Sequence, residues 1–421
     1  MTNIVEEVQL DYCDVMIKPK RSTLNSRSEP NIYRTYKMKY PLSYLHSQNT
    51  LFGNGLMVSN MATTGTFKMA EVMAKNLMFT CLHKHYTVEE LKEFFDKHDK
   101  QIIDVNSQYE NPLVYFKDYV FVSTGIKDGD YEKTRTILNM KLCNNLCIDI
   151  ANGYIPKLLD FVKKIREEFP YIVIMVGNVV TGDMVQDLIL NGADIVKVGI
   201  GPGANCTTRK QTGVGRSQLS AIMECAEAAH AVDGMICADG GITCVGDINK
   251  AYGAGADFVM VGSMVAGSDE AEGDIITKCY RTNEYSISEE TNEFGDVISQ
   301  HDKPQYIMPQ YKLAYGMSSK YAQDKHWNGM AKYRASEGIV TLKPYSGPVQ
   351  NTIDEYLGGL RSCMTYISAR RLKDIPKCTT FYRVNRILNN DGKGIMWWQY
   401  LKKLKLDLII LLEDLVVKSN G

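Results

Sequence analysis

The chain has 421 residues, a formal net charge of −1 and 44% hydrophobic residues. This length suits two or three ordinary domains, or one α/β barrel of about 250 residues with additions. Because basic residues are scattered along the chain and balanced by acidic ones, we expect no nucleic acid partner. A buried phosphate site for a small molecule needs no net positive charge and is not excluded.

The cysteines and the N-terminal sequence bear on the compartment. Eleven cysteines have no regular spacing and form no CxxC pair. This usage is typical of a reducing compartment, so we expect a cytoplasmic protein. The first residues, MTNIVEEVQLDY, do not resemble a secretory signal, and no apolar run is long enough to cross a bilayer. We therefore expect no membrane partner.

Eight short, nearly uninterrupted apolar runs rich in β-branched residues predict β-strands. They cover 55–61, 77–84, 118–125, 145–153, 171–180, 193–201, 234–241 and 256–263. Continuous apolar runs, rather than alternating ones, are typical of parallel strands that are buried on both faces.

Amphipathic segments between the later runs predict helices over 154–169, 182–192, 217–232 and 245–256. Eight strands that alternate with helices indicate an α/β fold, a (β/α)8 TIM barrel. A doubly wound open sheet is the structural alternative, and the number of strands favours the barrel.

Three segments fall outside the strand–helix alternation. Residues 1–50 precede the first strand, and the polar, fairly acidic segment 268–312 is expected to form a long excursion or flap. We predict a barrel domain over 1–385 and a helical extension over 386–421. In the extension, apolar residues recur at a and d spacing: Trp397, Leu401, Leu404, Leu408, Leu411 and Leu415.

Glycine-rich turns follow the seventh and eighth predicted strands, at Asp239–Gly241 and at Gly262–Ser263. In a barrel, the carboxyl ends of the strands meet on the face that carries the active site. Backbone N–H groups of such turns can approach phosphate oxygens because no Cβ intervenes. Asp239 would be repelled by a phosphate and is better placed to accept hydrogen bonds from a ribose. An ordinary turn is the alternative reading.

The loop after the sixth predicted strand, GIGPGANCTTRKQTGVG, surrounds Cys206 with five glycines. An inert structural thiol does not need such a loop, and partner ligands for a metal are missing. A nucleophilic thiol is favoured, with Arg209 and Lys210 near enough in sequence to support the thiolate. The carbonyl groups of the G-P-G turn are also suited to a monovalent cation.

Several motifs resemble those of the IMP dehydrogenase/GMP reductase family over roughly residues 8–385. They are LDYCDVMIKPKRSTLNSRSE, HKHY, CIDIANGY, GNVVTGDMV, KVGIGPGANCTTRKQTGVG, DGGIT, ADFVMVGSMVAG, YGMSS, YRASEG and LGGLRS. Together they are highly specific.

Three features favour the reductase branch of this family. The dehydrogenases usually carry paired CBS modules after the second strand, whereas about thirty residues join Tyr86 to the next strand here. They also use an Arg-Tyr pair on a flap, and no Arg-Tyr dipeptide occurs between Ser318 and Gly338. In addition, YRASEG supplies Glu337, which is similar to the glutamate that the reductases use in deamination.

The resemblance implies NADPH-dependent conversion of GMP to IMP with release of ammonia. Cys206 would attack C2 of the purine, and Thr208 and Glu337 would move the proton that the leaving nitrogen needs. The implied potassium site consists of carbonyl groups of Gly201, Gly203 and Cys206. The family is tetrameric, so we expect a homotetramer.

The resemblance also implies two groups of ligand-binding residues. The nucleotide-binding group is Asp239, Gly240, Gly241, Gly262, Ser263, Gly316, Met317, Ser318, Arg334, Ser336, Glu337 and Gly338. The cofactor-binding group is Ser26, Arg27, Lys84, Asp149, Ile150, Ala151, Ile200, Gly201, Tyr333, Arg334, Ser362, Cys363, Met364 and Thr365. Within it, 26–27 and 362–365 are expected from a neighbouring subunit, where an arginine suits the 2′-phosphate of NADPH.

The chain departs from the family pattern at three places. Ala204-Asn205 stands where Ser-Val is usual, and Arg216-Ser217 where Tyr-Pro is usual. Ser263 replaces a second glycine after the eighth strand. If that position needs a positive φ, serine would cost about 1 kcal/mol and weaken phosphate binding.

Other functions are weighed against the reductase. An IMP dehydrogenase without CBS modules is the alternative enzyme. A regulatory nucleotide-binding protein without turnover is a second alternative, against which the retained Cys206, Thr208 and Glu337 argue. A flavin-dependent barrel enzyme would share the phosphate site but would leave the cysteine loop unexplained.

Overall fold

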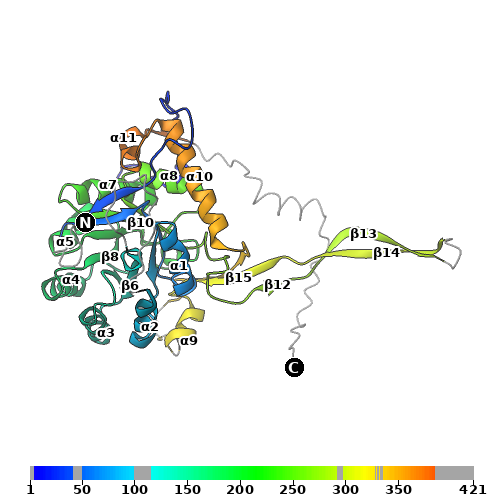
Figure 1. Ribbon diagram of the computed structural model, residues 1–421, viewed down its shortest axis with the longest axis horizontal. Coiled ribbons are helices and arrows are strands. Elements are labelled where there is room, and N and C mark those ends of the chain that lie inside the picture. The colour runs from blue at the N-terminus through cyan, green and yellow to red at the C-terminus, as the bar shows by residue number, and fades with distance from the viewer. Residues whose placement is uncertain are drawn as a thin grey trace. The chain divides into compact units, whose positions relative to one another are not determined.

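A computed structural model describes residues 4–40, 50–98, 115–291, 297–327, 329, 331 and 335–384. Eight parallel strands close into a barrel, so the predicted TIM barrel is confirmed (Figure 1). In chain order they are β4 (Leu56–Val58), β5 (Phe79–Leu82), β6 (Val120–Thr124), β7 (Asn145–Asp149), β8 (Val173–Val179), β9 (Ile195–Val198), β10 (Met235–Asp239) and β11 (Phe258–Val261). The barrel closes where β11 pairs with β4 in parallel.

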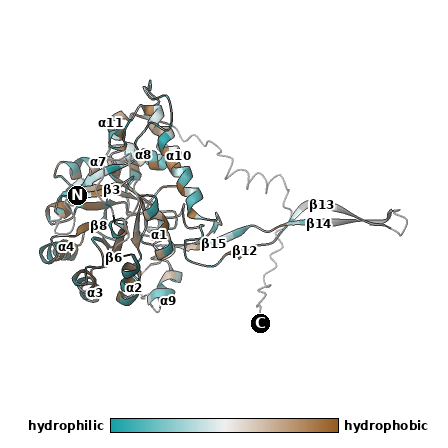
Figure 2. Cartoon of the chain, viewed as in Figure 1, coloured by the Kyte–Doolittle hydropathy of each residue, from teal (hydrophilic) through white to brown (hydrophobic). Residues whose placement is uncertain are grey.

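Helices surround the barrel strands, and the four that the sequence predicts are confirmed, with shorter ends. The helices of this layer are α1 (Phe67–Lys75), α2 (Val88–His98), α3 (Asp128–Asn139), α4 (Pro156–Glu168), α5 (Gly182–Leu190), α7 (Gln218–His230), α8 (Val245–Gly253) and α10 (Val349–Ile367). Coloured by hydropathy, they carry hydrophilic and hydrophobic residues on different sides (Figure 2). Their apolar sides pack on the strands, as the helical spacing of apolar residues requires.

Helix α1 shows how local sequence fixes an element. The Thr66 side chain accepts a hydrogen bond from the backbone N–H of Met69 at 3.1 Å, which caps the first turn. Met69, Ala70, Met73 and Ala74 are buried on one stripe, at the i, i+1, i+4 and i+5 positions of a helix face. Burial of this stripe then fixes the helix against β5, because apolar area is removed from water.

Several short elements stand outside the barrel alternation. The N-terminal ones are η1 (Tyr12–Asp14), β1 (Val15–Ile17), β2 (Arg34–Lys37) and β3 (Thr50–Gly53), and the later ones are η2 (Phe116–Tyr119), α6 (Thr208–Thr212), η3 (Leu372–Asp374), α11 (Ile375–Cys378) and β17 (Phe381–Arg383). Strand β1 pairs with β17, and β2 pairs with β3, both antiparallel. The pairing of β1 with β17 joins the N-terminal part of the chain to the segment that follows α10.

The polar segment 268–312 contains regular secondary structure. It includes β12 (Ile276–Thr277) and a long antiparallel hairpin of β13 (Tyr280–Thr291) and β14 (Val297–Ile307). Strand β15 (Gln310–Tyr315) follows and lies between β12 and β16 (Val340–Pro344) in a second small sheet. The sequence predicted only an excursion, because the hairpin residues are mostly polar and lack the apolar run that marks a buried strand.

Two units of the chain are described separately. One consists of residues up to 274 together with 312–385, and the other includes the hairpin region 275–311. The predicted helical extension over 386–421 and its boundary with the barrel lie outside the described residues and stay a prediction.

All eleven cysteines are free thiols. Among the described residues, we find no helix with both the length and the apolar character that crossing a bilayer requires.

Candidate active site

The carboxyl ends of the barrel strands bring the predicted site residues to one face. Lys84 follows β5, Asp149 ends β7 and Asp239 ends β10. The cysteine loop follows β9, and Gly262 follows β11. Residues that are far apart in sequence are therefore collected because parallel strands all end on the same side.

Three predicted catalytic residues form a connected chain of hydrogen bonds. The Cys206 thiol lies 3.2 Å from Thr208 Oγ1, and this hydroxyl donates to Glu337 Oε2 at 2.7 Å. Cys206 and Thr208 lie on the loop before α6 and at its start, whereas Glu337 comes from a segment 129 residues further on. All three side chains are partly exposed, so a substrate can reach them.

Backbone pairing holds the cysteine loop against the segment that carries Glu337. Cys206 and Gly338 form an antiparallel bridge, and Thr207 N–H donates to the Glu337 carbonyl at 2.9 Å. Gly316 packs beside this bridge, where an added Cβ would lie 2.7 Å from the Asn205 carbonyl oxygen. A side chain at this position would push the two segments apart, which is the physical reason for a glycine there.

Asn205, the polar departure from the family pattern, has a structural role. Its side chain is buried, and its Oδ1 accepts a hydrogen bond from Thr341 Oγ1 at 2.9 Å. The Asn205 carbonyl accepts from Ile339 N–H at 3.0 Å. The side chain of one loop residue is therefore joined to β16, and its backbone is joined to the residue that precedes this strand.

The two glycine-rich turns differ in backbone conformation. Gly240 and Gly241 have φ of +98° and +81°, a region that favours glycine. An added Cβ at Gly240 would lie 2.8 Å from the Pro202 ring. Ser263, in contrast, is not among the described non-glycine residues with positive φ, so the strain that its sequence position suggested is absent.

A buried lysine, which sequence reasoning missed, connects two predicted ligand-binding carboxylates. Lys197 on β9 is 1% exposed, donates to Asp149 Oδ1 and lies 3.2 Å from Asp239 Oδ2. Asn178 Nδ2 donates to the same Asp239 oxygen at 2.9 Å. The available signal was the single charged residue within the apolar run IVKVGIG.

This network fixes the charge state of its members. Burial opposes the charged form of Lys197, but attraction to Asp149 and Asp239 raises the pKa of this lysine well above its ordinary value. Burial likewise opposes the charged form of Asp149, yet Lys197 and, more weakly, Lys84 lower the pKa of this carboxyl overall. Asp149 is therefore ionised at neutral pH and Lys197 is protonated.

The expected support of the thiol by Arg209 does not appear in its contacts. The Arg209 guanidinium lies 3.5 Å from Asp11 Oδ2 and donates to the Arg216 carbonyl. An added Cβ at Gly201 would lie 2.5 Å from Arg209 Cγ, so the glycine loop folds around this side chain. Arg209 thus holds the loop, and Lys210 is exposed to solvent.

An aromatic cluster lies around Lys84. The rings of His85 and His326 stack with centroids 4.1 Å apart, and Trp327 meets His85 edge to face at 4.8 Å. His326 and Trp327 end α9 (Lys320–Trp327). The Lys84 ammonium lies 5.6 Å from the centroid of the Trp327 ring. These contacts fix α9, which lies between the Gly316 turn and Glu337 in sequence, against the loop after β5.

The other described residues predicted to bind the nucleotide lie near the Cys206–Gly338 bridge. Met317 Sδ accepts from Ala62 N–H at 3.4 Å, and the Ser318 carbonyl accepts from Glu337 N–H at 3.2 Å. Ser336 Oγ donates to the Gly338 carbonyl at 3.2 Å. Tyr333 and Arg334 lie outside the described residues.

The predicted cofactor residues form two groups. Ile150, Ala151, Ile200 and Gly201 lie at the ends of β7 and β9, beside Asp149. The other group joins the segment 20–31 to the end of α10, where Ser362, Cys363, Met364 and Thr365 lie. Thr23 and Pro30, which flank Ser26 and Arg27, contact Ser368 and Arg361 respectively. Met364, a member of the second group, is fully buried.

The carbonyl groups proposed for potassium belong to the same loop. Gly203 accepts a hydrogen bond from Cys206 N–H at 3.0 Å, so one lone pair of this oxygen is used. The carbonyl oxygens of Gly201 and Cys206 accept no backbone hydrogen bond from the described residues. Hard oxygen ligands of this kind fit an alkali cation, although three do not complete a coordination shell.

Comparisons with known proteins agree with the geometry. Residues 9–392 match the model of the IMP dehydrogenase / GMP reductase domain. The chain is 46% identical over 390 residues to the GMP reductase of Vibrio atlanticus (strain LGP32), covering 92% of this chain and 98% of that protein. It is 44% identical over 391 residues to the GMP reductase of Ascaris suum, covering 93% and 97%. For the GMP reductase of Shigella boydii serotype 18, the values are 45% over 392 residues, covering 92% and 99%.

Proposed function

The chain belongs to the IMP dehydrogenase / GMP reductase family, and on this premise we propose that it reduces GMP to IMP. In this reaction GMP, NADPH and two protons give IMP, NADP⁺ and ammonium. The observation that carries the proposal is the Cys206–Thr208–Glu337 chain, because reductive deamination needs both a nucleophile and a proton relay. The similar proteins that bear the name GMP reductase support the same reading.

In the first step, the Cys206 thiolate attacks C2 of the guanine base and gives a tetrahedral adduct. Glu337 then supplies a proton to the amino nitrogen through Thr208, because an amide-like anion is a poor leaving group. Loss of ammonia leaves a thioimidate between Cys206 and C2. This path replaces one difficult displacement by two easier steps, which is the general advantage of covalent catalysis.

NADPH, when bound, supplies the hydride that C2 of the thioimidate accepts. Lys84, Asp149 and the backbone at Ile200 and Gly201 would hold it on this face, with Ser26, Arg27 and the end of α10 contributed by a second subunit of a homotetramer. The open strand ends fit such a ligand, because Ala151 is exposed and Asp149 is 33% exposed beside Lys84. Expulsion of the thiolate from C2 then gives IMP and restores Cys206.

The nucleotide itself would be oriented by groups on either side of the cysteine loop. Asp239, which Lys197 and Asn178 hold in place, would accept hydrogen bonds from the ribose hydroxyls. The phosphate would meet N–H groups of Gly240, Gly241, Gly262 and Ser263, and the base would meet Met317, Ser336 and Gly338. A potassium ion on the carbonyl groups of the loop would hold the loop in shape.

The direct test mixes the purified full-length protein with GMP and NADPH, while nicotinamide absorbance and ammonia are followed together. We expect loss of absorbance with an equal amount of ammonia. NADH formed from IMP and NAD⁺ without the first reaction would instead identify a dehydrogenase. GMP binding without either reaction would identify a binding protein.

Replacement of the nucleophile provides the first variant. Cys206→Ala should abolish turnover and leave GMP binding largely unchanged, because the thiol forms a bond only during the reaction. Cys13→Ala, which removes an exposed thiol, serves as the control and should retain full activity. Turnover of Cys206→Ala near that of the unmodified protein would contradict the proposed nucleophile.

A further inference from the structure

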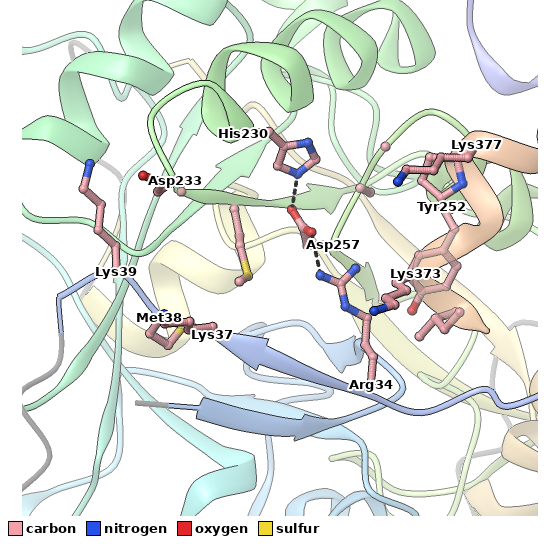
Figure 3. Close-up of a pocket in the computed structure, with 16 residues that line it drawn as sticks. Arg34, Lys37, Met38, Lys39, His230, Asp233, Tyr252, Asp257, Lys373 and Lys377 are labelled. Atoms are coloured by element: carbon pink, nitrogen blue, oxygen red, sulfur yellow. Dashed lines mark hydrogen bonds and ion pairs between the residues drawn. The ribbon is translucent and has the colours of Figure 1, made fainter. Parts of the chain in front are cut away.

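A cavity of about 680 Å³ lies at the end of the barrel opposite to the cysteine loop (Figure 3). Its wall includes Met235, the first residue of β10, and Asp257, which directly precedes β11. The turns at Gly240 and Gly262 follow the other ends of these two strands. A ligand in the cavity therefore cannot occupy the same space as a nucleotide at Cys206.

One carboxylate of the cavity is already neutralised by its surroundings. Asp257 is 4% exposed and accepts hydrogen bonds from His230 Nε2 at 2.9 Å, Arg34 at 3.3 Å and Ile236 N–H at 3.1 Å. Figure 3 shows the His230 and Arg34 side chains directed at this carboxylate. The hydrogen bond that His230 donates to Asp257 raises the pKa of His230, so Asp257 adds little negative charge to the cavity.

Four lysines from distant segments line the same cavity. Lys37 is on β2, Lys373 is on η3 and Lys377 is on α11, and their side chains make no hydrogen bond or ion pair within the described parts of the chain. Lys39 donates to the Val232 carbonyl at 2.6 Å. Against these four, the only lining carboxylate besides Asp257 is Asp233. The cavity therefore has an excess of positive charge.

Asp374, which directly follows Lys373 in the sequence, is already paired with an arginine. Asp374 receives two hydrogen bonds from Arg371, at 2.7 Å and 3.0 Å. Lys373 and Lys377 are thus not needed to neutralise it.

Arg34 adds an unfilled hydrogen-bonding position. Its Nε atom is buried and has no acceptor among the described residues, while its guanidinium carbon lies 4.4 Å from the centroid of the Tyr36 ring. A buried donor without an acceptor costs about 1–3 kcal/mol. An anionic oxygen is the kind of group that would satisfy it.

Apolar side chains line the cavity beneath these cations. Met38, Met235, Tyr252 and Leu372 line it, and each is less than 10% exposed. The volume falls within the range of about 300–1,000 Å³ that is usual for small-molecule sites. Apolar walls and several ammonium groups together suit a ligand that has both an aromatic ring and several negative charges.

We propose that this cavity binds a nucleoside triphosphate, with its phosphates on the lysines of β2, η3 and α11 and its ring on the apolar walls. Binding would be separate from the proposed reaction and would persist when the active site is filled. Because ammonium–phosphate contacts on a partly open surface are screened by salt, the affinity should fall as ionic strength rises.

The test measures calorimetric binding of ATP to the full-length protein with GMP and NADP⁺ both present at saturation. We expect one molecule of ATP per chain. The doubly substituted Lys373→Ala/Lys377→Ala protein should bind at least about tenfold more weakly, since two phosphate contacts are lost. Lys157→Ala/Lys163→Ala removes the same charge from exposed positions on α4 and should bind as the unmodified protein does.

Several outcomes would overturn the proposal. They are absence of binding, release of ATP by GMP and NADP⁺, and equal weakening in both doubly substituted proteins. Inorganic tripolyphosphate is the second probe. If it bound as tightly as ATP, the cavity would recognise only the phosphates, and the proposed contact of the ring with the apolar walls would be wrong. Thermal unfolding of both variants confirms that they are folded, and because the assay does not use turnover, its result is independent of the proposed GMP reduction.

Discussion

At the scale of single residues, Glu337 is the proposed proton donor of the reaction. Its carboxylate contacts Thr208 at 2.7 Å, and the proton for the leaving nitrogen must pass through this contact. Glu337→Gln keeps the size and the hydrogen bond but cannot exchange a proton. We expect kcat to fall by about 10²–10⁴-fold, as is usual for loss of a general acid, with the Kd for GMP unchanged. Steady-state kinetics and calorimetry measure the two quantities.

The matched control for this variant is Glu132→Gln at an exposed position of α3, which should retain full activity. If Glu337→Gln instead raised the Kd for GMP and left kcat unaltered, Glu337 would be a binding group and not a proton donor.

Lys197 supports a second prediction at this scale. Lys197→Met leaves Asp149 and Asp239 without their cation, and loss of one member of a buried ionic group costs about 3 kcal/mol or more. Since Lys197 lowers the pKa of Asp149, this stabilisation is complete above the pKa of an unfolded aspartate and is lost as the pH falls through the lower, folded value. The difference in unfolding free energy between the two proteins should therefore be large at pH 7 and smaller near pH 3, which lies below the ordinary pKa of aspartate of about 3.9.

Urea unfolding at the two pH values measures this difference, with Lys163→Met on the exposed side of α4 as the control. A difference that is the same at both pH values would mean that Lys197 acts through packing and not through charge.

The sequence predicts some of these residues and not others, for physical reasons. Cys206, Thr208 and Glu337 belong to short motifs whose residue types already specify the chemistry, and the structure brings them together. The contact that Arg209 makes with Asp11 depends on how a glycine loop folds, so proximity to Cys206 in sequence was a poor guide. Lys197 was missed because its two partners, Asp149 and Asp239, end other strands.

At the scale of elements, the contact between the loop after β5 and α9 depends on neutral histidines. Burial lowers the pKa of His83 to about 4 and the pKa of His85 to about 3, and nearby positive groups, including His326, lower the pKa of His85 further. An unfolded histidine titrates near 6.5, so the unfolded chain gains protons between pH 7 and pH 5 that the folded chain does not. Stability should therefore fall over this interval.

His85→Phe keeps an aromatic ring against His326 but cannot bind a proton, so unfolding free energy should depend less steeply on pH between 7 and 5. His230→Gln provides the opposite case. The pKa of His230 is raised, so its contribution is present at low pH and its removal should steepen the dependence. Urea unfolding at several pH values measures both slopes, and identical slopes for all three proteins would contradict the assignment.

Strands and helices were predicted accurately where the sequence has a clear apolar pattern. The eight barrel strands are buried, so their apolar runs were unambiguous, whereas helix ends shifted by a few residues because side chains and caps decide them. Strands β13 and β14 escaped prediction because most of their residues are polar.

At the scale of the whole molecule, the barrel core is complete without the hairpin. The main cluster of buried apolar residues runs from Tyr12 to Ile375 and includes none of the residues in 275–311 whose side chains the structure describes. Replacement of residues 279–308 by Asn-Gly would join Lys278 to Pro309, whose backbones already share a hydrogen bond of 3.1 Å. We expect the shortened protein to fold, with a Tm within a few degrees of the original and unchanged GMP binding.

A matched deletion tests whether this tolerance is specific to the hairpin. Removal of 235–261, which spans β10 and β11, should abolish cooperative unfolding, because it opens the barrel. If the hairpin deletion also failed to unfold cooperatively, the hairpin would be part of the stabilising core.

The sequence predicted the barrel as a whole because the number of buried strands almost determines it. It did not predict the cavity at the opposite end, since Arg34, Lys37, Lys373 and Lys377 look like ordinary surface charges until the fold brings segments 34–39 and 372–377 together. Subunit assembly as a homotetramer rests on family resemblance and stays a prediction.

The lysine between two carboxylates also limits how this protein can evolve. Loss of Lys197 would leave two carboxylates without their cation, whereas loss of Asp149 or Asp239 would still leave the buried ammonium with one carboxylate. A path on which the lysine is lost first therefore passes through a weakened protein. A descendant that lacks this lysine is expected to have replaced at least one of the two carboxylates in the same lineage.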